Sequence, residues 1–389
     1  MFDPINKLQY LPNSIGQLKN LRVLNLTLNR IDYLPSSIGE LLKLERLSLV
    51  MNCIKEIPEK IQNLTNSNYL GLNSNYISTI PEFIGKLKNL RSFFITFNQL
   101  YELPSSIGNL TNLSTLLLDH NKLTFLPNSF GQLTNLKILS LQNNNLSSLP
   151  KSFGNLTKLR EINLDNNKLT TLPSSIGQLK TGKISVKNNS LLALPETIGN
   201  LKYLYELHLE HNYLTELPNS FHELLNLRIL NLTENKFKKI PKVISFLKLN
   251  ELILDKNELT ELPSFLENFA CLKKLSLGNN KIESIPDSIN SLNSLIELHL
   301  GGNRIKKISS KIFELNSLKI LNLNDALITK VPESIYKLKN LQILTILRVN
   351  LKSLPISLEK IKTLEQIHLS NNSQIKIPKG LEKKIIYTA

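Results

Sequence analysis

Apolar residues recur along the whole chain with a fixed period instead of gathering in one core segment. One stretch, residues 113–135, reads LSTLLLDHNKLTFLPNSFGQLTN, with leucine at its first, fourth and sixth places. The fourth and sixth places belong to a period-two pattern, which predicts a short strand with alternate side chains buried. The Leu-Pro pair ends this strand. The segment after it predicts a brief helix with the proline at its first position.

This unit repeats nearly from end to end. Successive Leu-Pro pairs lie 23 residues apart, with two steps of 22, and an asparagine stands six positions before almost every one of these prolines. We expect each asparagine amide to satisfy backbone groups where the chain leaves the strand, so that stacked asparagines form a buried ladder. No unit can bury its own apolar face, so stacked units must share one core. We therefore predict a single domain: residues 1–20 a partial turn, 21–363 fifteen repeats, and 364–389 a closing turn.

The spacing L-x-x-L-x-L-x-x-N-x-L at this period is the signature of a leucine-rich repeat. The tails LPSSIGNLTN (103–112) and LPNSFGQLTN (126–135) resemble the intracellular 23-residue class, which includes Scribble, Erbin, plant Ras-group proteins and bacterial homologues. The resemblance implies an α/β fold, a right-handed solenoid or horseshoe with a parallel β-sheet on its concave face and short helices on its convex face. It also implies that a protein partner binds the concave face.

We number the positions of a repeat from its first leucine. Positions three, five, seven and eight are predicted to point from the concave sheet into solvent, and equivalent residues of neighbouring turns lie about 4.8 Å apart. In the first five complete turns these positions carry a contiguous apolar set typical of a protein-binding site. Its members are Val23, Leu28, Val50, Met51, Tyr69, Phe94, Phe97 and Leu117. The alternative is that the curl of the solenoid or a cap covers them.

Further along the chain the same positions become polar and acidic, and they hold five of the six histidines. We predict that part of this surface orients the partner, through Asp119, His120, His208, Glu210, His211 and Glu234. Lateral pairing between turns, as for His211, Glu234 and Lys256, is the competing interpretation. A pH-sensitive contact through the histidines is a further hypothesis. A metal site at His208, Glu210 and His211 is disfavoured, since no third nitrogen converges there.

The charge distribution limits the kinds of partner. The chain has 47 basic and 31 acidic residues, a formal net charge of +16. The four concave positions, however, hold six basic and ten acidic residues, so the excess positive charge lies elsewhere, for example at Lys238, Lys239 and Lys242. Nucleic-acid-binding proteins concentrate basic residues on one stripe, so nucleic acid is not expected. No apolar run approaches the roughly 20 residues of a membrane span, and stable membrane association is not expected either.

No catalytic or cofactor signature is present. The sequence contains no glycine-rich phosphate loop, nucleophile elbow or H-E-x-x-H motif. Its two cysteines, Cys53 and Cys271, are too few for a disulfide framework, which favours a reducing compartment. We interpret the chain as a non-catalytic protein-binding module in the cytoplasm, serving as a signalling scaffold or as a bacterial effector delivered into a host cell. A self-associating structural array, such as a homodimer, is the alternative.

Exceptions to the repeat predict local effects. Ser309 replaces a proline, while Ala326 and Val349 replace two asparagines in neighbouring turns. We expect this region to be weakened, either through drift of the repeat or because it forms a hinge or binding site near 326–349. The N-terminal end offers only Phe2 and Ile5 as closure, which suggests a missing upstream segment or a short cap.

Overall fold

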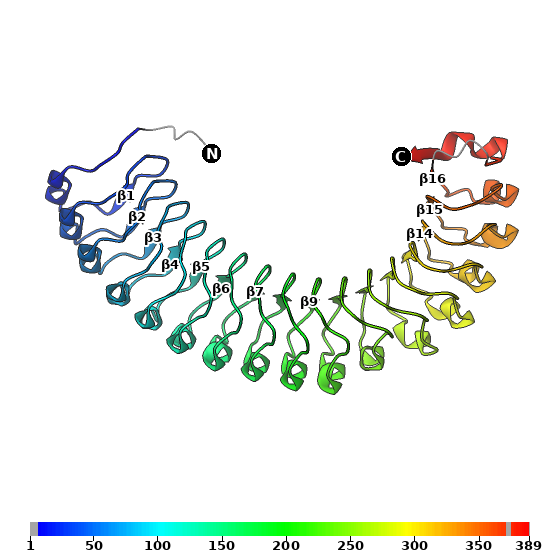
Figure 1. Cartoon of the computed structure of the whole chain (residues 1–389), viewed down its shortest axis with the longest axis horizontal. Coiled ribbons are helices and arrows are strands. Elements are labelled where there is room, and N and C mark those ends of the chain that lie inside the picture. The colour runs from blue at the N-terminus through cyan, green and yellow to red at the C-terminus, as the bar shows by residue number, and fades with distance from the viewer. Residues whose placement is uncertain (1–6, 371–374, 389) are drawn as a thin grey trace. The chain divides into compact units, whose positions relative to one another are not determined.

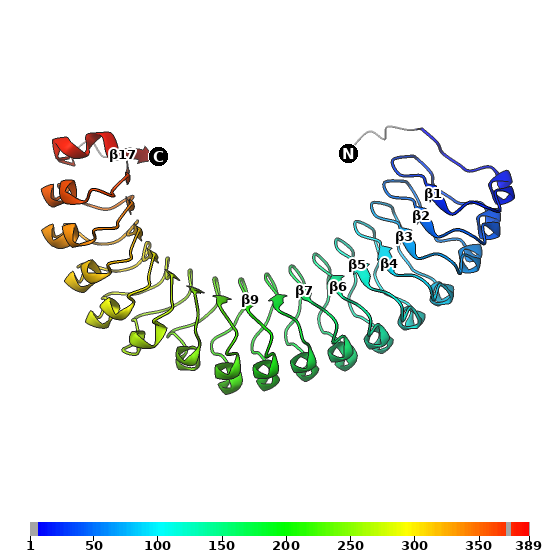
Figure 2. The same ribbon diagram turned by 180° about the vertical axis from the view of Figure 1, so that it is seen from behind.

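The computed structural model describes residues 7–370 and 375–388 of the chain. Phe2 and Ile5 lie outside this part. The chain forms two compact units, residues 1–204 and residues 205–389. In each unit, short strands stack into a parallel sheet on the concave side, and short 3-10 helices follow one another on the convex side (Figure 1). The strands have three residues in the first unit and three to five in the second. The view from behind shows the same two layers (Figure 2). The predicted solenoid is confirmed within each unit.

The first unit contains eight strands, each paired in parallel with the next along the chain. The strands are β1 (Val23–Asn25), β2 (Arg46–Ser48), β3 (Tyr69–Gly71), β4 (Ser92–Phe94), β5 (Thr115–Leu117), β6 (Ile138–Ser140), β7 (Glu161–Asn163) and β8 (Lys183–Ser185). The helices are η1 (Asn13–Gln17), η2 (Ser36–Glu40), η3 (Glu59–Asn63), η4 (Glu82–Lys86), η5 (Ser105–Asn109), η6 (Asn128–Gln132), η7 (Lys151–Asn155), η8 (Ser174–Gln178) and η9 (Glu196–Asn200).

The second unit continues with nine strands in the same parallel order. They are β9 (Glu206–His208), β10 (Ile229–Asn231), β11 (Glu251–Ile253), β12 (Lys274–Ser276), β13 (Glu297–His299), β14 (Ile320–Asn322), β15 (Ile343–Ile346), β16 (Gln366–Ser370) and β17 (Ile385–Thr388). The helices are η10 (Asn219–Glu223), η11 (Lys242–Phe246), η12 (Leu266–Phe269), η13 (Asp287–Ser291), η14 (Ser310–Glu314), η15 (Glu333–Lys337), η16 (Ile356–Lys360) and η17 (Lys379–Lys384).

Register between turns keeps equivalent residues side by side. Phe93 pairs with Leu116, and Leu116 with Leu139, so the buried side chain of one strand lies beside that of the next. Leu113, Leu116 and Leu118 are fully buried, as the pattern predicted. Each such side chain contributes about 1.5–3 kcal/mol through burial, and the contribution recurs at every turn. The core is therefore continuous along each unit.

The asparagine ladder is present as predicted. In a regular turn the Oδ1 atom of Asn121 accepts the backbone N–H of Leu100 in the preceding turn, at 3.0 Å. Its Nδ2 group donates to the carbonyls of Ile95 and Leu118 at 2.9 and 3.0 Å. The side chain is buried and joins two turns, because it satisfies backbone groups that no strand partner reaches.

One detail of the helix prediction is wrong. The prolines, such as Pro127, do not occupy the first helical position but precede it, in extended conformation with φ −67° and ψ 153°. The carbonyl of Pro127 then accepts the N–H of Phe130 at 2.9 Å, which closes the first turn. Ser309, which replaces a proline, takes the same place, and its side chain accepts the N–H of Lys311. Helix η14 therefore forms without the proline.

The recurring glycine of the helical segment is a contact point between turns in the first unit. A Cβ atom at Gly131 would lie 2.3 Å from the carbonyl oxygen of Ser152 in the next helix, and one at Gly154 would lie 2.2 Å from that of Ser175. Such close approach of backbones needs glycine. In the second unit the same place in the helices holds larger residues, such as His222, Phe313 and Tyr336.

Candidate functional site: the concave sheet surface

Side chains of the concave surface come from the strands and from the turn that follows each one. In the turn that begins at Leu113, Thr115, Leu117 and Asp119 are half-buried and His120 is exposed, while the residues between them are buried. The predicted orientation of positions three, five, seven and eight is thus confirmed for this turn.

Position eight has a backbone conformation that the sequence reasoning missed. All fourteen non-glycine residues of the described chain with positive φ stand at this position, with φ between 49° and 60°. Gly302 occupies it in one further turn, with φ 70°. Left-handed backbone favours glycine and asparagine. The asparagines at 143, 166, 188 and 279 were the available signal.

The apolar set of the first unit contains three bulky residues in this left-handed position. Leu28, Met51 and Phe97 have φ values of 60°, 55° and 52°. Met51 and Phe97 are 39% and 56% exposed, so burial of their side chains in the core does not offset the cost of the left-handed backbone conformation. We call the eight predicted residues, Val23, Leu28, Val50, Met51, Tyr69, Phe94, Phe97 and Leu117, the apolar surface patch.

Ring contacts join part of this patch across neighbouring strands. Tyr69 and Phe94 meet edge to face, with ring centroids 5.3 Å apart. Gly71 makes room for this arrangement, since a Cβ there would lie 3.0 Å from the Tyr69 hydroxyl oxygen. The guanidinium carbon of Arg46 lies 4.1 Å from the centroid of the Tyr69 ring. Arg46 therefore belongs to this cluster, although the apolar pattern did not include it.

A second ring contact lies at the turn. Phe97 stacks on His120, with centroids 4.1 Å apart and planes 10° from parallel. Val23 is separated from Tyr69 by Arg46, its neighbour in the strand register. The structure thus brings Tyr69, Phe94 and Leu117 together on adjacent strands and Phe97 with His120 on adjacent turns, and it leaves Val23 apart.

Some of the polar side chains that were predicted to contact a partner are already hydrogen-bonded within the sheet. Asp119 accepts the Ser140 hydroxyl and, at 2.9 Å, the backbone N–H of Gln142 in the next turn. Asp165 and Asp255 are bonded in the same way, Asp165 to the N–H of Lys187 at 2.8 Å. Position-seven aspartates therefore join turns, which leaves Asp119 less free to contact a partner.

The histidine cluster of the second unit is paired as well. His208 lies between two carboxylates of its own turn, with Nε2 2.5 Å from Glu206 and Nδ1 3.2 Å from Glu210. One turn further, the Glu234 carboxylate contacts both His211 and Lys256. The hydrogen bond that Lys256 donates to Glu234 raises the pKa of Lys256. Lateral pairing, the competing interpretation, therefore accounts for these charges.

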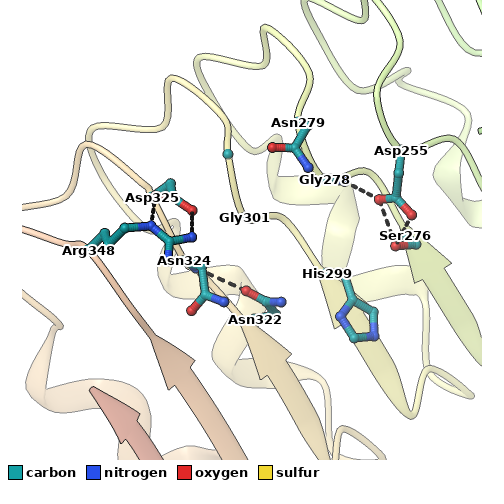
Figure 3. Close-up of a pocket in the computed structure, with 11 residues that line it drawn as sticks. Asp255, Ser276, Gly278, Asn279, His299, Gly301, Asn322, Asn324, Asp325 and Arg348 are labelled. Carbon is teal, nitrogen blue, oxygen red and sulfur yellow. Dashed lines mark hydrogen bonds and ion pairs between the residues drawn. The ribbon is translucent and has the colours of Figure 1, made fainter. Parts of the chain in front are cut away.

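A polar hollow of about 350 Å³ opens on the concave surface over β12 to β15. Gly278, Gly301 and Gly302 leave space that larger side chains fill in other turns. Asn322, Asn324 and the Arg348–Asp325 ion pair lie along one side, and Asp255 and Ser276 along the other (Figure 3). The sequence pattern did not predict this hollow, although its three glycines stand at positions seven and eight of two neighbouring turns.

Within residues 7–370 and 375–388, no three His, Cys, Asp or Glu side chains converge as metal ligands. Cys53 and Cys271 are free thiols. No helix among the described residues has the length and apolar character of a membrane span.

Family models for leucine-rich repeats match three parts of the chain: a leucine-rich repeat region over residues 58–142, a leucine-rich repeat over 247–305 and 294–351, and a pair of repeats over 134–177. No curated protein matches the sequence.

Solved structures agree with these models. A leucine-rich repeat protein of Leptospira interrogans is 35% identical over 98% of this chain and 99% of its own, with a TM-score of 0.86. A plant peptide hormone receptor in complex with its ligand is 30% identical, with a TM-score of 0.78, and the match spans 65% of that receptor. The ectodomain of an Arabidopsis thaliana membrane receptor kinase is 28% identical, with a TM-score of 0.77, over 48% of its length. Leucine-rich repeats are typically protein-interaction modules, and the chain belongs to the leucine-rich repeat proteins.

Proposed function

We propose that the chain is a non-catalytic module that binds a protein partner through the apolar surface patch. The observation that carries this proposal is the placement of Leu28, Met51 and Phe97 in left-handed backbone conformation. A bulky residue there costs about 1–2 kcal/mol, which asparagine or glycine at the same position largely avoids. Residues that lower the stability of the fold and expose apolar surface are expected where binding of a partner offsets the lost stability.

The cluster of Arg46, Tyr69 and Phe94 supports the same site. Aromatic residues and arginine are enriched among the residues that dominate binding energy, and these three already hold one another in place by ring contacts. Preorganised side chains lose little conformational entropy when a partner binds. We expect Tyr69, Phe94 and Phe97 to be the anchors, and the paired polar groups around His208 and Glu234 to contribute orientation at most.

The similarity to the Leptospira protein over nearly the full length of both chains favours a bacterial setting for this activity. In that setting we propose an effector that engages a protein of a host cell, with a signalling scaffold inside the producing cell as the other role. The two free thiols agree with a reducing, cytoplasmic compartment.

The test is capture of a partner with a variant that keeps the fold. Phe94→Ala combined with Phe97→Ala is expected to lose a protein that the wild type captures from lysate, since both rings are at least partly exposed and neither fills the core. Ile138→Ala, an exposed residue on β6 outside the patch, is the matched control and should retain the partner. Unchanged capture by the folded double variant would contradict the proposal.

Light scattering of the same samples separates the alternative function. A monomer at all concentrations agrees with a module for another protein. A concentration-dependent dimer that the double variant abolishes would assign the patch to self-association between copies of the chain.

A further inference from the structure

We propose, building on the protein-binding function, that the polar hollow over β12 to β15 binds an acidic side chain of the partner. The hollow lies entirely in the second unit, on the surface that strands β12 to β15 present (Figure 3). We call it the donor-lined hollow, because side-chain N–H groups of Asn322, Asn324 and Arg348 line it.

The orientation of two amides is fixed by the wall. The backbone N–H of Asn324 donates to Oδ1 of Asn322 at 3.0 Å, and the N–H of Leu347 donates to Oδ1 of Asn324 at 2.8 Å. A backbone N–H can only donate, so each amide must turn its oxygen to the wall and its Nδ2 group away from it. In the described chain, neither of these Nδ2 groups has a hydrogen-bond acceptor.

The arginine at the rim adds a third donor. Arg348 binds Asp325 through Nε at 2.6 Å and through Nη2 at 2.8 Å, and this pair leaves Nη1 available. The hydrogen bond with Asp325 raises the pKa of Arg348, so the guanidinium stays charged across the accessible pH range. Three donor groups, from Asn322, Asn324 and Arg348, thus line one hollow.

Both carboxylates of the hollow are already bonded to its wall. Asp325 is paired with Arg348, and Asp255 accepts the N–H of Gly278 at 2.5 Å and the hydroxyl of Ser276 at 2.7 and 2.8 Å. These contacts take up part of the acceptor capacity of both carboxylates. The lining is also too polar for an apolar side chain. A carboxylate, which only accepts and binds charged donors strongly, matches these groups.

The glycines of the hollow let polar side chains pack against the backbone, since a Cβ atom at Gly301 would lie 2.9 Å from Oδ1 of Asn322 and one at Gly302 would lie 2.3 Å from Oδ1 of Asn279.

The probe is a phage library of short linear peptides, panned on the wild type and counter-selected on Gly301→Leu, which fills the hollow. Position seven carries leucine in a later turn, at Leu347. A Cβ atom at Gly301 would lie 3.0 Å from the carbonyl oxygen of Asn324, so thermal unfolding of this variant is the control for its fold. We expect the selected peptides to carry Asp or Glu. Their synthetic copies should lose affinity when that residue is changed to Asn or Gln.

Asn324→Asp is the decisive variant. It keeps an oxygen for the N–H of Leu347 but replaces the outward donor with a charged acceptor, so peptide affinity should fall about tenfold or more. Asn73→Asp is the matched control, because Asn73 accepts the N–H of Thr96 at the same 2.8 Å in the first unit. It should retain the peptides, and thermal unfolding should show both variants folded.

Selection of basic or neutral peptides, or affinity unchanged by Asn324→Asp, would overturn the inference. The Phe94→Ala, Phe97→Ala double variant should still bind the peptides. The loss or retention of the captured partner by this double variant tests the proposed function separately. Different results would therefore contradict the two proposals.

Discussion

At the scale of single residues, a substitution at position eight is expected to change the stability of the fold and the affinity for a partner in opposite directions. Phe97→Asn is expected to stabilise the chain by about 1 kcal/mol, because asparagine adopts left-handed backbone more readily than phenylalanine, while partner binding weakens. Denaturant unfolding measures the stability. The reverse change, Asn166→Phe, removes a favourable residue from the same position and should destabilise by a similar amount. A loss of stability in Phe97→Asn would show that the stack on His120 is structural, and the patch would lose its strongest support.

The residue scale also shows what sequence could predict. The repeat pattern determines which positions face the concave surface, so the positions that make up the apolar surface patch were predictable, whereas the left-handed conformation of Leu28, Met51 and Phe97 was not. Beyond the asparagine ladder, the pattern carries no information on which side chains make contacts between turns, because the partners described here stand 21 to 23 positions apart. The bonds of Asp119 to the next turn, the contact of Arg46 with Tyr69 and the amide orientations of the donor-lined hollow therefore needed the structure.

At the scale of elements, carboxylates on one helix cap the next. Glu82, the first residue of η4, accepts the backbone N–H groups of Ser105 and Ser106 at 3.0 and 2.9 Å, at the start of η5. Hydrogen bonding from Ser106 and Ser105 lowers the pKa of Glu82. Such caps link helices that have no side-chain cap of their own.

The lowered pKa gives this cap a defined pH dependence. Its stabilisation is present above the unfolded-state pKa of the carboxyl group and is lost as pH falls through the lower, folded-state pKa. Glu82→Gln should therefore lower the melting temperature at neutral pH, and the difference from wild type should shrink as the pH approaches 3. Thermal unfolding at several pH values measures this. A difference that stays constant with pH would mean that the charge of Glu82 does not contribute.

At the scale of the whole molecule, the repeat makes stability a sum of neighbouring interactions, so that a missing contact weakens its own region first. Ala326 and Val349 are buried where other turns place asparagine. The backbone N–H groups of Ile305 and Ile328 accordingly lack the amide acceptor that Asn303 gives Ile282 at 3.0 Å. The loss of these rungs was predictable from sequence, since the ladder has a fixed spacing, whereas the cap that replaces proline at Ser309 was not.

Hydrogen exchange read by mass spectrometry should show this weakness. We expect amides in residues 303–351 to exchange faster than those in the regular turns of the same unit, residues 229–302, because local opening there breaks fewer bonds. Ala326→Asn restores an acceptor for Ile305 and donors for the carbonyls around it. It should slow exchange in this region and stabilise the unit by about 1 kcal/mol. Equal protection across both segments, or no change in Ala326→Asn, would show that apolar packing at Ala326 and Val349 already compensates for the missing rungs.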